Sequence, residues 1–257
     1  MAVSELFQAS KRFQENYEWL SVAKYFDRID STQKRILQFL PKKIEGAVLV
    51  VAESQTKAVG RHGREWISPP GGIWFTLGLP MKTRTIAEMA PFSIVCSHVV
   101  VNALREINNL NCEMKWPNDI LYQGKKVAGI LNSTVKKFKN EWFLVGIGVN
   151  VNNELPDSLS DSATTIQKIR KQSQGRSRLI EAIIEAVWVA WGDFDRTGFG
   201  PYQKSIEDKL LGKGKMTRIL VGNHQTEGTI LGIDPQGSLL IQSGSNKKTI
   251  HAGEVVG

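Results

Sequence analysis

The amino-acid sequence predicts an α+β fold, in which helices pack on a central mixed β-sheet and a small SH3-like β-barrel follows at the C-terminal end. Apolar runs of strand length at 47–52 and 73–77 predict buried strands. Apolar residues recur at helical spacing over 85–108 and 178–194, which predicts two long amphipathic helices. Strands and helices that alternate in this way favour a sheet covered by helices.

The C-terminal part of the chain changes character after a Gly- and Lys-rich linker at 211–215. From residue 216 onward, short strand-like segments alternate with turns such as Asp234-Pro-Gln-Gly237, which is typical of a tiny β-barrel. We therefore expect residues 1–210 to form one domain and residues 214–257 to form the barrel.

Shorter segments of the larger domain are assigned from their local patterns. They are an amphipathic helix over 4–19, a strand over 22–26, a helix that ends near Pro41, and strands over 113–116, 125–131 and 141–152. The first of these helices is too short to be a helix-turn-helix DNA-binding domain.

The composition narrows the class of partner without choosing one. The chain has 257 residues and a net charge of +8, with basic residues interleaved with acids along its length. Such a balance favours a nucleotide, nucleic acid or acidic protein as the partner. Cys96 and Cys112 lack metal-ligand spacing, and no apolar run reaches membrane-spanning length. We therefore expect a reduced, cytoplasmic protein that binds no membrane.

A basic, glycine-containing segment from Gln55 to Trp66 lies between the two buried strands. Gly60 and Gly63 alternate there with Arg61 and Arg64, and His62 lies between them. With little apolar surface to bury, the segment should be mobile until a ligand orders it. Guanidinium groups on a flexible backbone suit an incoming phosphate or carboxylate, whereas the simpler interpretation is a solvated basic loop.

The tetrapeptide Asp30-Ser-Thr-Gln33 precedes the helix that ends near Pro41. Asp and Ser are good helix N-caps, and Asp30 with Gln33 resembles a capping box, so the pattern favours a cap. The alternative is that these hydroxyls and this amide face a ligand at the helix N-terminus.

A second group of polar residues flanks a predicted hairpin between 113 and 131. Lys115, Asn118, Asp119 and Lys126 would bring two cations and two oxygen ligands near one another. Asn and Asp after Pro117 are also ordinary turn formers. The grouping suits a phosphate together with a divalent metal.

The predicted strand over 141–152 has two unlike faces. Every second residue from Phe143 to Val151 is apolar and should be core, while Gly146, Gly148 and Asn150 occupy the other face. Glycines in a strand indicate close approach of another group. We expect either a bare floor under a flat ligand or a helix packed closely on the sheet.

Taken together, these segments resemble the motifs of the biotin–protein ligases over essentially the whole chain. The matching segments are Asp30-Ser-Thr-Gln33, Ala58-Val-Gly-Arg-His-Gly-Arg64, Lys115-Trp-Pro-Asn-Asp119, Lys126-Val-Ala-Gly-Ile-Leu131, Gly146-Ile-Gly-Val-Asn150 and, near the C-terminus, residues 228–240. Each motif alone is weak, but their order and spacing are specific. The resemblance implies the biotin–lipoate ligase fold, similar to class II aminoacyl-tRNA synthetases, in a monofunctional enzyme without an N-terminal DNA-binding domain.

The resemblance implies a two-step reaction. Biotin and ATP form biotinyl-5′-AMP, which a lysine of a biotin carboxyl carrier protein then attacks. ATP and Mg²⁺ would be required, DNA would not be bound, and a homodimer is left open.

The resemblance also implies roles for residues at the matching positions. Arg61 and Lys126 would be catalytic and would contact both substrates. The remaining biotin-binding set would be Ser31, Thr32, Gln55, Gly60, Gly129, Leu131, Gly146 and Gly148; the remaining ATP-binding set would be Arg64, Trp66, Asn118 and Asn150; and Asn118 with Asp119 would hold Mg²⁺. Asn152 is assigned to the end of the strand.

The chain departs from the family pattern in three places. Ala58-Val59 replaces the first Gly-Arg of the loop, His62 stands where an arginine is common, and Gln33 replaces Asn. Two alternatives follow: a lipoate or octanoate transferase of the same fold, with Cys96 or Cys112 as nucleophile, or a catalytically impaired biotin- or adenylate-binding protein. A nucleic-acid binder is disfavoured by the dispersed charge.

Overall fold

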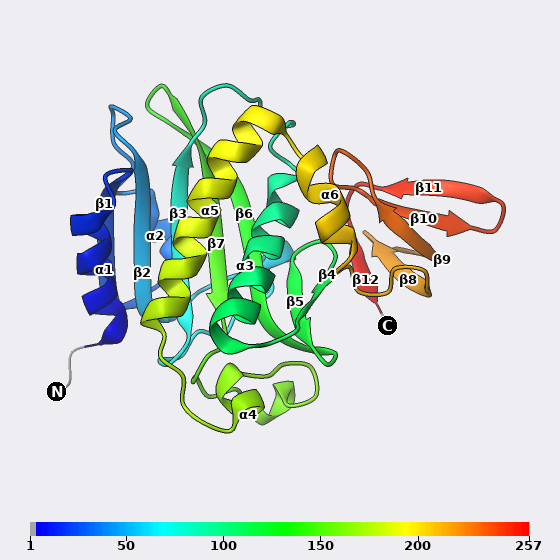
Figure 1. The fold of residues 1–257 in the computed structure, drawn as a ribbon, viewed down its shortest axis with the longest axis horizontal. Helices are drawn as coiled ribbons and strands as arrows, with labels where there is room; N and C mark the ends of the chain where they lie inside the picture. Colours follow the sequence, from blue (N-terminus) through cyan, green and yellow to red (C-terminus); the bar gives the residue numbers. More distant parts are fainter. Residues whose placement is uncertain (1–3, 257) are drawn as a thin grey trace.

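The computed structural model describes residues 4–256 and contains two β-sheets (Figure 1). The larger sheet has the strand order β1-β2-β3-β7-β6-β5-β4, and the smaller has the order β11-β10-β9-β8-β12. In the larger sheet β1 and β2 are parallel, and all other neighbours are antiparallel, so the sheet is mixed as predicted.

The strands are β1 (Leu20–Ile29), β2 (Ala47–Gln55), β3 (Ile73–Pro80), β4 (Glu113–Lys115), β5 (Asp119–Tyr122), β6 (Lys125–Lys137), β7 (Asn140–Val149), β8 (Met216–Val221), β9 (His224–Ile233), β10 (Leu239–Ser243), β11 (Asn246–Ile250) and β12 (Glu254–Val256). The α-helices are α1 (Glu5–Asn16), α2 (Thr32–Ile36), α3 (Phe92–Asn108), α4 (Ile166–Arg170), α5 (Ser177–Thr197) and α6 (Gly200–Glu207), with short 3-10 turns at Arg61–Gly63 and Asp157–Leu159. None of the helices between residues 4 and 256 is long and apolar enough to cross a membrane.

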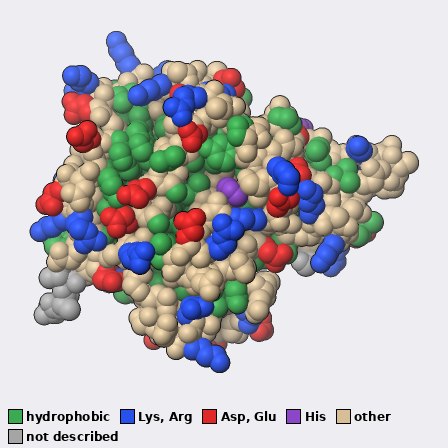
Figure 2. All heavy atoms as spheres, viewed as in Figure 1, with side chains coloured by type: hydrophobic (Ala, Val, Ile, Leu, Met, Phe, Trp, Pro, Cys, Tyr) green, Lys and Arg blue, Asp and Glu red, His purple; other side chains and the backbone are tan. Residues whose placement is uncertain are grey.

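One face of the larger sheet is covered by α1, α3 and α5 (Figure 1). The side chains of Ile73, Phe75 and Leu77 on β3 and every second residue from Phe143 on β7 point into this core, because successive strand residues alternate between faces. On the helix-covered face, basic and acidic side chains are interspersed at the surface (Figure 2).

The opposite face of the sheet is divided along β7. At one end Trp142 and Leu144 pack in a second small core with Ile36 and Leu40, at and after α2. At the other end the same face of β7 carries only Gly146 and Gly148, so the sheet lies bare there. The alternation predicted for this strand is confirmed.

The smaller sheet forms a C-terminal β domain beside α6, at the opposite end of the molecule from α1 (Figure 1). Its buried residues are Ile219, Ile230, Ile233, Leu239, Ile241, Ile250 and Val255. The small C-terminal β domain expected from the turn-rich sequence is confirmed.

Several predicted boundaries differ from the structure. The helix predicted over 85–108 begins at Phe92, because Pro91 precedes its first turn and Thr85–Ala90 forms turns instead. The helix predicted to end near Pro41 ends at Ile36. The strand β5, the helix α6 and the last strand, β12, were not predicted.

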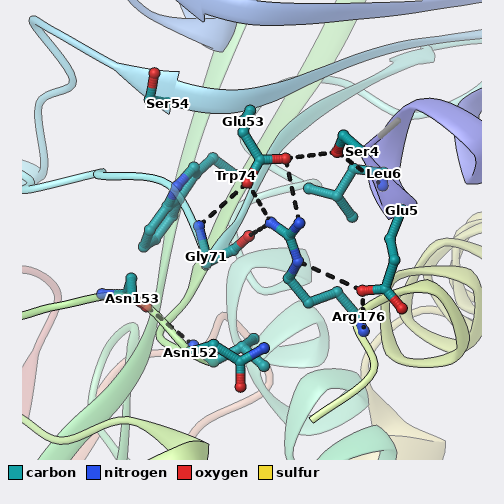
Figure 3. A network of polar contacts seen from close by, with 12 residues as sticks. Ser4, Glu5, Leu6, Glu53, Ser54, Gly71, Trp74, Asn152, Asn153 and Arg176 are labelled. Carbon is teal, nitrogen blue, oxygen red and sulfur yellow. Dashed lines mark hydrogen bonds and ion pairs between the residues drawn. The ribbon is translucent and has the colours of Figure 1, made fainter. Parts of the chain in front are cut away.

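A buried ion pair holds the N-terminal helix, the end of β2 and the start of α5 together (Figure 3). The guanidinium of Arg176 lies 2.6 Å from Glu53 Oε1 and donates to Gly72 O at 3.0 Å. The same carboxylate accepts hydrogen bonds from the hydroxyl of Ser4, at 2.6 Å, and from the amide of Gly71, at 3.2 Å. Burial raises the pKa of Glu53, but hydrogen bonds from Arg176 and Ser4 outweigh it and hold this pKa below its usual value.

We predict that Arg176→Met lowers the free energy of unfolding by about 3 kcal/mol near neutral pH, because it leaves the Glu53 carboxylate buried and unpaired. Since the folded-state pKa of Glu53 is depressed in the wild type, its stabilising contribution is complete above the unfolded-state pKa of about 4.3 and is lost as the pH falls through the folded-state value. The difference in the free energy of unfolding between wild type and variant should therefore become smaller in acid, as urea unfolding at several pH values would show. Arg196→Met is the control, because the Arg196–Asp193 pair is exposed and its loss should cost no more than about 0.5 kcal/mol. An equal effect of both substitutions would contradict the prediction.

Candidate active site

A cavity of about 720 Å³ lies on the bare part of the sheet, within the size range of small-molecule sites. Every site residue predicted from the sequence lines it. These residues are Ser31, Thr32, Gln55, Gly60, Arg61, Arg64, Trp66, Asn118, Asp119, Lys126, Gly129, Leu131, Gly146, Gly148 and Asn150. They come from six separate segments of the chain, which the fold brings together around one cavity.

Three glycines form the floor of the cavity. A Cβ atom at Gly148 would lie 2.7 Å from the indole Nε1 of Trp66, and one at Gly129 would lie 3.1 Å from the same ring. A Cβ atom at Gly146 would lie 2.7 Å from Nε2 of Gln33. Gln33 of the short helix α2 therefore lies over Gly146, as the expectation of a closely packed helix requires, and the loop residue Trp66 lies over the other two. The expectation that a flat ligand lies on this floor stays a prediction.

One end of the cavity is lined by uncharged polar groups. The amide of Thr32 donates to Gln55 Oε1 at 2.7 Å, and Gln55 Nε2 donates to Ser68 Oγ at 3.0 Å. The hydroxyl of Thr76 on β3 donates to that of Thr32 at 2.9 Å. Ser31 precedes α2 but makes no side-chain capping bond, so the predicted helix cap is wrong and the hydroxyl is left facing the cavity.

The other end of the cavity is lined by charged groups. Lys126 Nζ lies 2.6 Å from Asp119 Oδ1 and 4.8 Å from the centre of the Trp66 ring. This pair confirms that the predicted hairpin brings these two residues together. The indole Nε1 of Trp66 is buried without a hydrogen-bond partner among the described residues, so a donor is available on this wall.

The basic loop is fastened to the C-terminal β domain. Arg61 Nη1 donates to Asn118 Oδ1 at 3.3 Å and to Gly253 O at 3.1 Å. Arg64 makes a bidentate pair with Glu254 of β12, at 3.2 and 2.8 Å. The hydrogen bond from Arg64 lowers the pKa of Glu254, while burial lowers that of Arg61.

Asn118 and Asp119 offer the donors that Mg²⁺ accepts. Asn118 Nδ2 donates to Ile130 O at 2.8 Å, which turns Oδ1 toward Arg61. Between residues 4 and 256 no cluster of three His, Cys, Asp or Glu side chains has metal-site geometry. Mg²⁺ is usually held by one or two protein oxygens together with substrate phosphates and water, so the chemistry of one carboxylate and one amide suits that ion. To reach these two oxygens the ion would have to replace Arg61 at Asn118 Oδ1 and Lys126 at Asp119 Oδ1.

Sequence reasoning missed part of the cavity wall. Leu155, Leu159 and Ala163 line it from a segment that reads as a polar loop, and Glu254 lines it from the C-terminal β domain. Leu155 and Leu159 stand isolated among polar residues in the sequence, and this was the available indication that the segment lines a cavity. Asn152 does not line the cavity; its side chain bonds the backbone of Gln174, as expected of a strand-end residue.

The comparisons with known proteins agree with this geometry. Residues 25–152 match the Biotin/lipoate A/B protein ligase family, and residues 213–256 match the Biotin protein ligase C terminal domain. The bifunctional ligase/repressor BirA of Bacillus subtilis is 31% identical over 236 residues, which span 90% of this chain and 72% of that protein. The biotin–[acetyl-CoA-carboxylase] ligase of Paracoccus denitrificans is 30% identical over 240 residues, which span 89% of this chain and 97% of that protein.

Among solved structures, the biotin protein ligase from Aquifex aeolicus in complex with biotin and ATP matches with a TM-score of 0.81 at 29% identity, covering 93% of this chain and 98% of that one. The sequence motifs, the cavity and these likenesses lead to one conclusion: the chain belongs to the biotin–protein ligase family.

Proposed function

We propose that this ligase activates biotin with ATP to biotinyl-5′-AMP and transfers the biotinyl group to a lysine of a biotin carboxyl carrier protein. The observation that carries the proposal is one cavity with an uncharged polar end and an end where four cations and four carboxylates meet. In the first step the biotin carboxylate attacks the α-phosphate and pyrophosphate leaves. In the second, the carrier amine attacks the mixed anhydride and AMP leaves.

The polar end is assigned to the ureido ring of biotin. Ser31, Thr32 and Gln55 offer hydroxyl and amide groups that can both donate and accept, which suits a ring with one carbonyl and two N–H groups. The backbone of Gly129 would complete this contact, and Leu131, Gly60, Gly146 and Gly148 would line the fused rings.

The end lined by charged groups is assigned to ATP. Trp66, Arg64, Asn118 and Asn150 would contact the nucleotide, and the apolar side chains of Leu155 and Leu159 offer a wall for a flat base. Mg²⁺, held by Asn118 and Asp119, would neutralise phosphate charge when bound.

Arg61 and Lys126 are assigned to the chemistry. A carboxylate and a phosphate repel each other, so both must be held by fixed cations before they come within bonding distance. Lys126 is held between Asp119 and Trp66, and Arg61 between Asn118 and Gly253, so both cations are oriented before substrates arrive. We assign residues 1–210 to the catalytic domain and 214–257 to the C-terminal domain of a cytoplasmic enzyme.

A cysteine-dependent lipoate or octanoate transferase is disfavoured. Burial raises the pKa of the Cys96 thiol, and it raises that of Cys112 to about 12. A buried thiol with a raised pKa is a poor nucleophile, and neither cysteine lines the large cavity.

Incubation with biotin, MgATP and a carrier domain should add one biotinyl group to one lysine, as mass spectrometry would show. A carrier that is left unmodified with biotin, or that is modified only when lipoate or octanoate is offered in place of biotin, would overturn the proposal.

We predict that Lys126→Ala slows adenylate formation by on the order of a hundredfold or more and changes biotin affinity much less, because the ammonium acts on charge that develops in the transition state. Pyrophosphate release measures the first quantity, and calorimetry with biotin alone measures the second. Lys125→Ala is the matched control, since the neighbouring lysine bonds Ser160 O and does not line the cavity. Equal losses in rate and affinity would make Lys126 a ground-state binding residue only.

Val59 stands where the family pattern has a loop arginine, and it is 44% exposed at the cavity edge. We predict that Val59→Arg slows release of biotinyl-adenylate about tenfold to a hundredfold, because a charge-assisted hydrogen bond contributes roughly 1.5–3 kcal/mol. Glu65 pairs with Val59 across the loop and competes for the new guanidinium, so adding Glu65→Gln should slow release further. Stopped-flow release at fixed ionic strength is the measurement.

The control for this prediction is Ile86→Arg, which adds the same charge at an exposed residue outside the cavity. Unchanged release in Val59→Arg, or an equal effect of the control, would refute an anion-binding role for this position. Arg61→Gly, by contrast, should abolish both retention and efficient synthesis of the intermediate.

A further inference from the structure

Trp116, in the middle of the Lys115–Asp119 motif, has no part in the roles assigned above. Its side chain is 4% exposed, and its indole Nε1 donates to Gly237 O of the C-terminal β domain at 3.0 Å. A hydrogen bond across 121 residues of sequence therefore connects the motif to the turn between β9 and β10.

The β9–β10 turn that receives this bond is itself rigid. Asp234 Oδ1 accepts from the amides of Gln236, at 2.9 Å, and Ser238, at 2.8 Å. Gly237 has a φ of +80°, and a Cβ atom there would lie 3.0 Å from Cα of Pro91, next to the start of α3. The turn is thus seated closely on the catalytic domain.

A second contact holds the other end of the same turn. Gln203 Nε2 of α6 donates to Ile233 O at 2.7 Å, and Glu207 Oε1 accepts from the Ile233 amide at 3.1 Å. Residues 233–238 are therefore held on one side by α6 and on the other by Trp116. This turn is thus one of the contacts that position the β domain.

The residues at the start of β12 contact the basic loop. Gly253 and Glu254 bond Arg61 and Arg64, and Arg61 also bonds Asn118, two residues after Trp116. Arg61 thus bridges the motif and the start of β12, and it can reach Gly253 O together with Asn118 Oδ1 only while the β domain is docked.

We propose that Trp116 is a positioning residue, whose indole N–H docks the C-terminal β domain so that Gly253 and Glu254 hold the two loop arginines over the cavity. The role in catalysis rests on the proposed function, whereas the docking role does not. Trp116 acts through the β domain and the loop, and its ring forms part of the cavity wall.

The test is Trp116→Phe, which keeps an aromatic wall and removes the N–H. We expect the KM for ATP to rise about three- to tenfold, because one hydrogen bond is lost, and biotin affinity to stay unchanged. Hydrogen exchange should accelerate by a similar factor at the β9–β10 turn and in the loop, where the amides of Gly60 and Trp66 are bonded. Gly237→Ala, which displaces the acceptor carbonyl, should reproduce both effects.

The matched control is Trp142→Phe, because Trp142 is equally buried and its Nε1 has no hydrogen-bond partner among the described residues. It should leave the KM for ATP and loop exchange unchanged. The proposal would be overturned if hydrogen exchange at the turn and in the loop of Trp116→Phe were as slow as in the wild type. It would also be overturned if Trp142→Phe raised the KM for ATP and accelerated this exchange in the same way.

A double-mutant cycle with Glu254→Gln separates docking from direct contact with substrate. If Trp116 acts through β12, the effects of Trp116→Phe and Glu254→Gln on the KM for ATP should be less than additive. Full additivity would make Trp116 a substrate contact and would overturn the positioning role. A wild-type chain without ligase activity would refute the proposed function, and the exchange measurements would still decide the docking role.

Discussion

The site depends on the absence of side chains at three positions of two adjacent strands. On the same face of β7, Trp142 and Leu144 fill a core, and two residues further on Gly146 and Gly148 leave the sheet bare. Gly129 of β6 is the register partner of Gly148, so the bare area is continuous across the strands. Any Cβ atom at Gly148 would displace the indole of Trp66, and with it the surface on which Lys126 rests. Glycine weakens a strand, and neighbouring strands on both sides of β7 compensate for it.

The charges around the cavity are balanced before any substrate is present. Four cations, Arg61, Arg64, Lys115 and Lys126, share the wall with four carboxylates, Glu65, Asp119, Asp161 and Glu254. Lys126 and Arg64 are each paired with a carboxylate, and Arg61 rests on neutral oxygens. An arriving phosphate can therefore replace one anionic partner by another, and the chain need not leave a buried cation unpaired at any stage. Such prior orientation of charged groups is what makes electrostatic stabilisation of a transition state effective.

Much of this arrangement could be predicted from the sequence, because the strands and long helices show clear apolar periods and the motif residues lie at their ends. Alternation along β7 identified the floor, and the Lys126–Asp119 pair followed from the hairpin. Local patterns failed where tertiary contacts decide the structure. Ser31 has the chemistry of a helix cap but lies at the cavity, and α6 has too few apolar residues to be recognised alone. The contact between Arg64 and Glu254 spans 190 residues and has no local sequence signal.

The contacts of the basic loop could not be predicted from its own residues. It lacks apolar anchors before Trp66, and a segment of that kind has little to gain from burial. Its partners are Asn118, 57 residues further along the chain, and Gly253, 192 residues further along. Asn118 and Gly253 belong to the two domains that the Trp116–Gly237 bond also joins, so the contacts of the loop lie at the interface between these domains. Val59 adds no cation to the loop. Arg61 and Arg64 therefore make the polar side-chain contacts between this stretch and distant segments. A small displacement of β12 would weaken both of these contacts together, so the docking role proposed above gives the C-terminal β domain an influence on the cavity that goes beyond the place of Glu254 in its wall.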